Sequence, residues 1–379
     1  MRHTEKNVYL VSFEYFPISQ GGLARHAKAV IDRLLVHKVF KAVIAVPMRD
    51  KIEINRRIVT IPCLFFKNKY LCYLEFSFRV LLKLIYRFNK DTFVFFSLLS
   101  YFLIPLLPKK FYLFVHSNEK RVFLTDYPGE SIKERFIRKS IYFINYQWES
   151  FLCRKARRVF SVSPSLKEET VQQYKMNRHN ITVITNGLDK RVFSKGTGQK
   201  KLNKDLLYVG KISPRKNISD LIEILKLLTN SDPQFKLHIM GSGEKSYLNK
   251  IRSMIHEYKL DSNVFFHPYR TDVELNTLYE KCSIFVTTSL VEGFGLVVLE
   301  AMSKGLPVVV YENLGVRDII INKTNGYLIK RFDYQSFVNK ILYLYKNKNI
   351  YNKMSDNAIK RVNDFRWGPS VKKLVKEIG

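Results

Sequence analysis

The sequence predicts an α/β protein made of two doubly wound, Rossmann-like domains. Its 379 residues suffice for two separate cores, and a hydrophobic content of 46% is that of a globular protein. Short runs of β-branched and aromatic residues alternate with helical patterns along most of the chain. Such alternation is typical of parallel sheets that are covered by helices.

The first series of strands lies in the N-terminal half, and we expect residues 1–185 to form one domain. Its helical patterns are clearest from Ala24 to Leu35 and around FRVLLKLIYRF, residues 78–88. The strand-like runs are NVYLVSF (7–13), KAVIAV (41–46), DTFVFF (91–96), FYLFVH (111–116) and RRVFSVS (157–163).

A second series predicts another domain over residues 186–362. Its strand-like runs are LLYVG (206–210), FKLHIMG (235–241), NVFFHP (263–268), SIFVTTS (283–289), LPVVV (306–310) and NGYLI (325–329). The polar stretch 194–205 is expected to be a surface loop. Residues 363–379 contain an amphipathic helix, and we expect this helix to return to the N-terminal domain.

The net charge of +31 favours anionic partners, namely acidic lipid, phosphorylated substrates or nucleic acid. A compositional bias toward lysine is the alternative. The four cysteines have neither paired nor metal-ligand spacing, so we expect reduced thiols and no metal site. The N-terminus does not read as a signal peptide, and the apolar stretch 93–107 is too short to span a bilayer as a helix.

The segment EGFGLVVLE carries two carboxylates, Glu292 and Glu300, in otherwise apolar surroundings. A buried carboxylate needs a hydrogen-bonding partner, and that partner can be a ligand. The segment joins a predicted strand to a helix that ends near Gly305, and ligands of open parallel sheets bind at the carboxyl ends of strands. Gly293 and Gly295 let the backbone approach a ligand closely, and the helix start offers free N–H groups. We expect the two glutamates to meet hydroxyl groups and cations from elsewhere to meet phosphates.

Three further loops follow predicted strands and carry candidate residues. QGGLARH contains Gly21 and Gly22, which would allow a phosphate to approach. VGKISPRKN contains Lys211 and Lys216, which would neutralise a diphosphate leaving group. MGSGE contains Gly241 in a similar turn. Each loop by itself has an ordinary alternative, because glycines make turns and most lysines are only solvated.

Together these segments resemble the retaining glycosyltransferases of family 4, which have the GT-B fold. Glu292 and Glu300 fit the E-x7-E motif of that family. Its sequence motifs are also closely matched by the segments TTSLVEGFG, EAMSKGLPVVV and TNGYLI. VSPSLKEE and VITNGLD match the segments that lead into the second domain. The resemblance covers most of the chain and is specific in the second half.

The resemblance implies a nucleotide-diphosphate sugar held by the C-terminal domain and an acceptor at the N-terminal domain, with no cofactor. Glu300 should bind the ribose hydroxyls and Glu292 the donor sugar. Lys211, where the family more often has arginine, and Lys216 should bind the diphosphate. His116 matches an N-domain histidine that lies near the reacting sugar. Backbone amides near Phe294, Gly295 and Leu296 should assist at the donor, for which Gly21, Gly22, Gly241 and Gly293 are also candidates.

The expected reaction is metal-independent transfer of a hexose-type sugar with retention of configuration. No D-x-D triplet is present, so we expect Lys211, Lys216 and the helix N-terminus to stabilise the leaving group. Retention in this family is explained by front-face attack, in which the departing phosphate helps to take the acceptor proton. His116, Lys211, Lys216 and Glu292 are therefore the predicted catalytic residues.

The acceptor is expected to be a lipid-linked or surface-polysaccharide precursor. Alternatives are a glucan-synthase-like transferase with a soluble acceptor, a DNA-base glucosyltransferase, a non-hydrolysing epimerase and a non-catalytic scaffold. The E-x7-E motif argues against the last two, and we do not expect nucleic acid as a partner. Cations interleave with apolar residues in the segments 67–90 and 133–158, which suggests an anionic membrane surface as a partner. The alternative is that the apolar residues pack on the sheet. We expect a cytoplasmic protein, either free or attached at the inner membrane face.

Overall fold

The chain divides into two compact units. The computed structural model describes residues 7–16, 18, 21–47, 56–64, 69–88, 90–96, 111–188, 202–268 and 271–378. Unit 1 comprises Met1–Leu124, Ile137–Asn186 and Trp367–Gly379. Unit 2 comprises Thr125–Phe136 and Gly187–Arg366.

Unit 1 is built on a parallel sheet of seven strands among the described residues, in the order β3-β2-β1-β4-β5-β6-β7. Its central strands are nearly continuous apolar runs, as expected for strands that are buried on both faces. All five residues of β1 and of β5 are buried. The strands are β1 (Val8–Ser12), β2 (Phe40–Pro47), β3 (Ile58–Cys63), β4 (Thr92–Phe95), β5 (Phe111–Val115), β6 (Arg158–Ser161) and β7 (Ile181–Val183).

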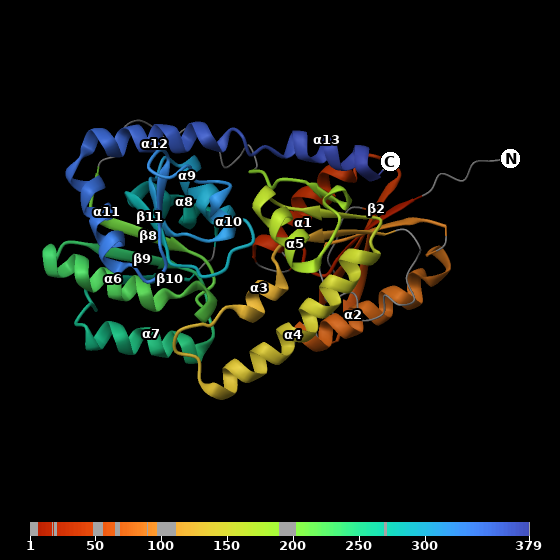
Figure 1. Ribbon diagram of the computed structural model, residues 1–379, viewed down its shortest axis with the longest axis horizontal. Helices are drawn as coiled ribbons and strands as arrows, with labels where there is room; N and C mark the ends of the chain where they lie inside the picture. The colour runs from red at the N-terminus through yellow and green to blue at the C-terminus, as the bar shows by residue number, and fades with distance from the viewer. Residues whose placement is uncertain are drawn as a thin grey trace. The chain divides into compact units, whose positions relative to one another are not determined.

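Helices of unit 1 bury their apolar sides within the unit. The α13 segment packs against α1 and buries Trp367, Leu374 and Ile378. In the view of Figure 1, α13 runs along the upper side of this unit, and α2 and most of α4 run along its lower side. The helices are α1 (Gly22–Leu34), α2 (Lys69–Leu84), α3 (Glu119–Leu124), α4 (Ile132–Lys155), α5 (Pro164–Tyr174) and α13 (Trp367–Ile378), with short 3₁₀ turns η1 (Ile85–Arg87) and η4 (Arg178–Asn180).

Unit 2 is built on a second parallel sheet, with six described strands in the order β10-β9-β8-β11-β12-β13. The strands are β8 (Asp205–Val209), β9 (Lys236–Met240), β10 (Val264–His267), β11 (Ile284–Thr287), β12 (Val308–Tyr311) and β13 (Gly326–Ile329). The helices are α6 (Ile218–Ser231), α7 (Lys245–Glu257), α8 (Asp272–Lys281), α9 (Leu296–Ser303), α10 (Leu314–Arg317), α11 (Tyr334–Lys346) and α12 (Lys348–Val362), with a 3₁₀ turn η6 (Pro214–Lys216). In Figure 1, α6 and α7 lie below these strands and α8, α9 and α12 lie above them.

The predicted fold class is confirmed, because both sheets are parallel and helices connect their strands. Two strands were not predicted, β3 and β7, and both lie at the edges of the first sheet. Their sequences contain fewer large apolar residues than the central strands, since an edge strand packs against fewer neighbours. The predicted helix around residues 78–88 is longer and begins at Lys69. Residues 97–107 of the apolar stretch and most of the polar stretch 194–205 lie outside the described residues.

Candidate active site

The predicted donor-binding residues follow three neighbouring strands of unit 2. Lys211 and Lys216 follow β8, Gly241 follows β9, and the segment from Glu292 to Glu300 follows β11. The strand order reverses between β8 and β11, which are adjacent in the sheet. Ligands of open parallel sheets bind at such a reversal, beyond the carboxyl ends of the strands. The sheet therefore brings these candidates to the edge at which ligands of such sheets bind.

Gly241 holds two of these loops together. Its φ is 156°, and a Cβ atom at this position would lie 1.9 Å from the carbonyl oxygen of Gly210. The loops are joined by backbone bonds from Gly210 to Met240 and from Ile212 to Ser242, at 3.0 and 2.8 Å. Gly241 is thus required for packing of the loop that carries Lys211 and Lys216, whatever part it has in binding a ligand.

Lys216 and Glu292 form a buried ion pair. The ammonium group of Lys216 donates a hydrogen bond to Oε1 of Glu292, and each side chain is 12% exposed. Burial lowers the pKa of Lys216, and Glu292 only partly opposes that effect. Burial by itself would raise the pKa of Glu292, but Lys216 and then Arg215 outweigh it, so that this pKa is lowered. The lowered pKa of Glu292 means that its carboxyl group is ionised at neutral pH, and that charge favours the ammonium form of Lys216.

Lys211 differs from Lys216 in its surroundings. Its side chain is 63% exposed, and its ammonium group lies 3.9 Å from Oε1 of Glu244. An ion pair at that exposure and distance contributes little to stability. Lys211 is therefore accessible to a ligand, whereas Lys216 is held by Glu292.

Glu300 lies on α9 and is buried, as its sequence context predicted. The hydroxyl of Tyr279 on α8 donates a hydrogen bond to Oε2 of Glu300 at 3.4 Å. That distance is long for a hydrogen bond between oxygens. Tyr279 is thus a protein partner of the buried carboxylate that the sequence could not identify.

The loop between Glu292 and Glu300 ends where α9 begins. Gly295 caps the helix in the left-handed conformation, with φ of 83°, and Leu296 is the first helical residue. The first amide groups of a helix have no acceptor within it, so they are available to an anion. The Phe294 side chain is buried and packs edge-on against Phe365, with 5.9 Å between the ring centroids. Only the backbone of Phe294 is thus a candidate for contact with a donor.

In unit 1 the predicted residues follow β1 and β5. Gly21 caps α1 with φ of 124°, and Gly22 is the first residue of that helix. His116 directly follows β5, and within the described part of the chain its buried Nε2 atom has no hydrogen-bond partner. Burial, and then the neighbouring His26, hold the pKa of His116 well below its usual value, so the ring is neutral. This sheet reverses between the neighbouring strands β1 and β4, and β5 lies next to β4.

Sequence reasoning missed two polar residues beside His116. His26 lies on α1 with its ring centroid 4.5 Å from that of His116. Its Nδ1 atom lies 2.5 Å from Oδ1 of Asn186. His26 occurs in the same QGGLARH segment that pointed to the glycines, but a contact across 160 residues has no signal in the local pattern.

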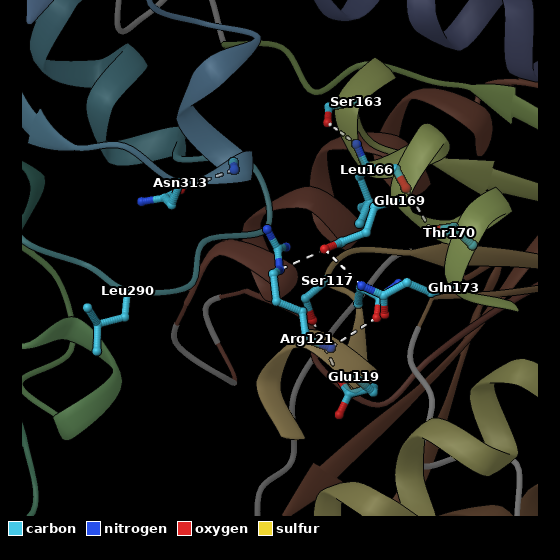
Figure 2. A network of polar contacts seen from close by, with 12 residues as sticks. Ser117, Glu119, Arg121, Ser163, Leu166, Glu169, Thr170, Gln173, Leu290 and Asn313 are labelled. Carbon is cyan, nitrogen blue, oxygen red and sulfur yellow. Dashed lines mark hydrogen bonds and ion pairs between the residues drawn. The ribbon is translucent and has the colours of Figure 1, made fainter. Parts of the chain in front are cut away.

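A second polar network in unit 1 was also missed. Figure 2 shows Arg121 of α3 and Gln173 of α5 pointing toward the Glu169 carboxylate. Nε of Arg121 lies 3.6 Å from Oε2 of Glu169, and the Gln173 amide donates to Oε1 at 3.2 Å. The contact between Arg121 and Glu169 joins α3 to α5.

Near this network, Glu149 of α4 is completely enclosed. It accepts hydrogen bonds from the Tyr174 hydroxyl and from the backbone N–H of Glu119, the latter at 2.9 Å. Burial, and then the nearby charge of Glu119, raise the pKa of Glu149 well above its usual value. A carboxyl group in this position links α3, α4 and α5, and we assign it to packing rather than to chemistry.

Two doubly wound sheets, each with polar and charged residues at its reversal, define the GT-B class of glycosyltransferases. A sucrose-phosphate synthase from Thermosynechococcus elongatus is similar in structure, with a TM-score of 0.81 at 19% identity and 98% coverage of each chain. The family described as "Glycosyltransferase Family 4" matches residues 20–192, and "Glycosyl transferases group 1" matches residues 189–361. The chain belongs to this glycosyltransferase family, whose members are retaining enzymes.

Curated relatives match parts of the chain. An uncharacterized glycosyltransferase of Haemophilus influenzae is 30% identical over 55% of this chain and 57% of its own length. A UDP-Gal:alpha-D-GlcNAc-diphosphoundecaprenol alpha-1,3-galactosyltransferase of Escherichia coli is 28% identical over 62% of this chain and 64% of its own length. The chain thus spans less than two thirds of either relative.

None of the helices in the described ranges combines the length and the apolar character that a membrane crossing demands.

Proposed function

We propose that this protein is a retaining, metal-independent glycosyltransferase that moves a hexose-type sugar from a nucleotide-sugar donor. The observation that carries the proposal is the Lys216–Glu292 pair at the reversal of the second sheet, with Glu300 buried on the helix that follows. A cation, a carboxylate beside it and a second carboxylate eight residues later suit a diphosphate, a sugar and a ribose. Unit 2 is then the donor-binding unit, and unit 1 is the acceptor-binding unit.

In this proposal the donor separates the ion pair and binds each of its two members through a different group. The diphosphate takes up the Lys216 ammonium group, whose charge is balanced by Glu292 in this structure. Glu292 then becomes available to accept hydrogen bonds from the donor sugar, while Glu300 accepts them from the ribose. Lys211 adds a second, accessible cation. Charge that grows on the leaving diphosphate is stabilised by both lysines and by the amides at the start of α9.

No protein base is assigned to the acceptor hydroxyl. A phosphate oxygen of the leaving group accepts its proton as the new glycosidic bond forms on the same face of the sugar. His116 is neutral and so suits a hydrogen bond to a sugar hydroxyl rather than proton donation. This division of roles requires neither a bound metal nor a cofactor.

The acceptor that we propose is a lipid-linked or surface-polysaccharide precursor. The galactosyltransferase of Escherichia coli is named for a diphosphoundecaprenol acceptor, which is a lipid carrier. In unit 1, Leu74, Phe78 and Leu82 lie four residues apart on α2 and are all exposed. The opposite side of α2 is buried through Phe76, Val80 and Leu84, so this helix is apolar on two sides.

Helix α4 also has exposed apolar residues in unit 1. Ile137 and Ile144 are both exposed, and they stand seven residues apart on one side of the helix. Lys83 of α2 is exposed, and Arg79 is half-buried and paired with Glu75 at 2.9 Å. An apolar stripe edged by cations fits an anionic lipid surface, where each well-placed cation contributes on the order of 1 kcal/mol. We infer that α2 and α4 dock on the membrane that holds the acceptor.

The experiment that tests the transferase proposal is a screen of nucleotide sugars by thermal shift. A ligand that binds only the folded state at 100 times its Kd stabilises it by about 2.7 kcal/mol. We expect at least one nucleotide sugar to raise the midpoint and to be hydrolysed slowly without an acceptor, including in the presence of a chelator. Raised midpoints with free nucleotides but never with nucleotide sugars, or no hydrolysis of any donor, would contradict the proposal.

A further inference from the structure

The backbone on both sides of Lys216 is hydrogen-bonded to the loop that follows β11. The N–H of Leu290 donates to the carbonyl oxygen of Arg215 at 3.0 Å. The hydroxyl of Thr288 donates to the carbonyl oxygen of Asn217 at 2.7 Å. Arg215 and Asn217 are the residues directly before and after Lys216. The position of the Lys216 backbone relative to this loop is therefore fixed from two sides.

The bond between Thr288 and Asn217 holds an unusual turn of the backbone. Asn217 ends η6 and begins α6 with φ of 51°, in the left-handed region. That conformation costs free energy for a residue other than glycine and persists where the surroundings enforce it. The carbonyl of Asn217 also accepts the N–H of Asp220 at 3.2 Å, which belongs to the first turn of α6. Thr288 adds a contact from outside that helix, and both Thr288 and Asn217 are completely buried.

The loop after β11 is itself held in place by other parts of unit 2. The carbonyl oxygen of Ser289 accepts a hydrogen bond from the Asn313 side-chain amide at 2.9 Å. The carbonyl oxygen of Leu290 accepts one from the Arg331 guanidinium group at 2.6 Å. Glu292 follows two residues later in the chain. The loop can thus serve as a fixed support for the turn that carries the lysine.

A fixed backbone matters for Lys216 because a lysine side chain has many rotamers. Its ammonium group stays in one place only where the backbone is fixed and a partner holds the end of the side chain. Glu292 is that partner, and both side chains are largely buried. A shift of the turn at Asn217 would move the backbone of Lys216 and with it the ammonium group.

We propose that Thr288 is a positioning residue of the donor site, whose hydroxyl group holds the turn from which Lys216 reaches Glu292 and the donor diphosphate. This inference rests on the proposed function for the identity of the ligand. The placement of Lys216 beside Glu292 can be measured without a ligand. Thr288 acts through Lys216, and its hydroxyl is not assigned a contact with the donor.

The ligand-free test is a titration of Glu292, followed by ¹³C NMR of the full chain labelled at the glutamate carboxyl groups. Burial raises the pKa of Glu292, and the charges of Lys216 and Arg215 outweigh that effect. Thr288→Val is close to threonine in shape but lacks the hydroxyl. It should let the ammonium group move away and so raise the pKa of Glu292. Thr288→Ser keeps the hydroxyl and should leave this pKa at its wild-type value.

Thr170→Val is the matched control in unit 1. Thr170 of α5 is also completely buried, and its hydroxyl donates to the carbonyl oxygen of Leu166 at the same distance of 2.7 Å. This variant loses an equivalent bond far along the chain from Lys216 and should leave the pKa of Glu292 unchanged. Glu292→Gln identifies the resonance. An unchanged pKa of Glu292 in folded Thr288→Val, or an equal rise in Thr170→Val, would overturn the inference.

A second hydroxyl-free variant covers a failure of the first to fold. Thr288→Ala introduces no new methyl group into the buried site, so it avoids any clash that valine would cause. Its effect on the pKa of Glu292 should have the same direction as that of Thr288→Val. A folded Thr288→Ala with a wild-type pKa of Glu292 would contradict the positioning role in the same way.

A double-mutant cycle tests whether Thr288 acts on transfer through Lys216. Thr288→Val should lower kcat about tenfold to a hundredfold, as expected for a misplaced group. The donor KM should rise less than kcat falls, because the charge on the diphosphate grows toward the transition state. In a Lys216→Met background the same change should have little further effect. An equal loss of kcat in both backgrounds would reduce Thr288 to a packing residue.

The two proposals fail in different ways. If no nucleotide sugar binds or reacts, the transferase proposal fails, while the titration of Glu292 still decides whether Thr288 places Lys216. If transfer is measured and Thr288→Val changes neither the pKa of Glu292 nor kcat, the positioning role fails and the transferase proposal stands.

Discussion

Lys216 and Glu292 are both largely buried and form an ion pair, so each depends on the other. Glu292 also accepts a hydrogen bond from Ser289, and the charge of Arg215 favours its ionised form. Removing one partner of a buried pair leaves an uncompensated charge, whereas removing both can be nearly neutral. The pair therefore couples the fold of unit 2 to the chemistry that we assign to it.

This dependence is measurable in unfolding experiments. Lys216→Met should lower the free energy of unfolding by about 3 to 5 kcal/mol, because Glu292 is left buried without its cation. The double variant Lys216→Met with Glu292→Leu should recover most of that loss in urea denaturation. Lys211→Met is the matched control at an exposed lysine and should stay within about 0.5 kcal/mol of wild type. Similar losses for the two lysine variants would show that the ion pair is not structural.

A substitution of Glu300 tests whether this residue binds the donor. Glu300→Gln should weaken binding of the donor by about 1.5 to 3 kcal/mol, because a charged acceptor is replaced by a neutral one of the same shape. Titration calorimetry with the nucleotide sugar found in the screen measures the change. Glu280→Gln alters an exposed carboxylate of α8 and should leave affinity unchanged. Affinity that is equal in the Glu300 and Glu280 variants would remove Glu300 from the ribose site.

At the scale of elements, α2 and α9 differ in how many of their apolar residues are buried. Helix α9 is mostly apolar and buries six of its eight residues, including Glu300. Helix α2 is similarly rich in apolar residues, but Leu74, Phe78 and Leu82 remain exposed. The apolar residues of α9 are explained by its burial in the core. Helix α2 has more apolar residues than its one buried side requires.

The exposed side of α2 predicts binding to anionic vesicles. The double variant Phe78→Ser with Leu82→Ser should reduce co-sedimentation with vesicles that contain phosphatidylserine, because both side chains would otherwise insert among the lipids. Binding of the wild type should fall as salt rises, since cations contribute. Val273→Ser is the control, because Val273 is 74% exposed on α8 of unit 2.

Other outcomes of this assay have definite meanings. Wild-type binding that is absent at low salt, or equal on neutral vesicles, would leave a soluble acceptor. Salt-dependent retention on DNA in place of vesicles would favour the DNA-base alternative. A concentration-dependent dimer that the Phe78 and Leu82 changes abolish would assign the surface to self-association.

At the scale of the whole molecule, two units with separate cores need not respond alike to pH. In unit 2, His238 of β9 is buried, with Nδ1 2.9 Å from Nε2 of His267 and Nε2 3.3 Å from Oδ1 of Asp205. Burial, and then the charge of Lys281, lower the pKa of both histidines below 6.5. Unfolded chains therefore bind more protons than the folded unit as the pH falls through 6.5.

We expect the free energy of unfolding of unit 2 to decrease between pH 7.5 and 5.5, by at most about 1.4 kcal/mol per pH unit for each proton. The stabilising contribution is fully present above pH 6.5 and is lost as the pH falls toward the lowered pKa of the folded state. Denaturation at a series of pH values, followed by a probe in unit 2, measures this slope. His238→Gln should flatten it, and His256→Gln at an exposed position should not. A slope unaffected by His238→Gln would assign the pH dependence to other groups.

The sequence by itself determined the alternation of strands and helices, the fold class and the loops that carry the candidate residues. These features depend on residues close together in the chain, whose spacing decides which sides are apolar. Edge strand β3 escaped prediction because its burial is incomplete, and β7 because it has only three residues. Only the tertiary structure decided which residues meet: Lys216 with Glu292 across 76 positions, and His26 with Asn186 across 160. The physical reason is that the charge, tautomer and exposure of a side chain are set by what packs around it, and most of that comes from distant segments.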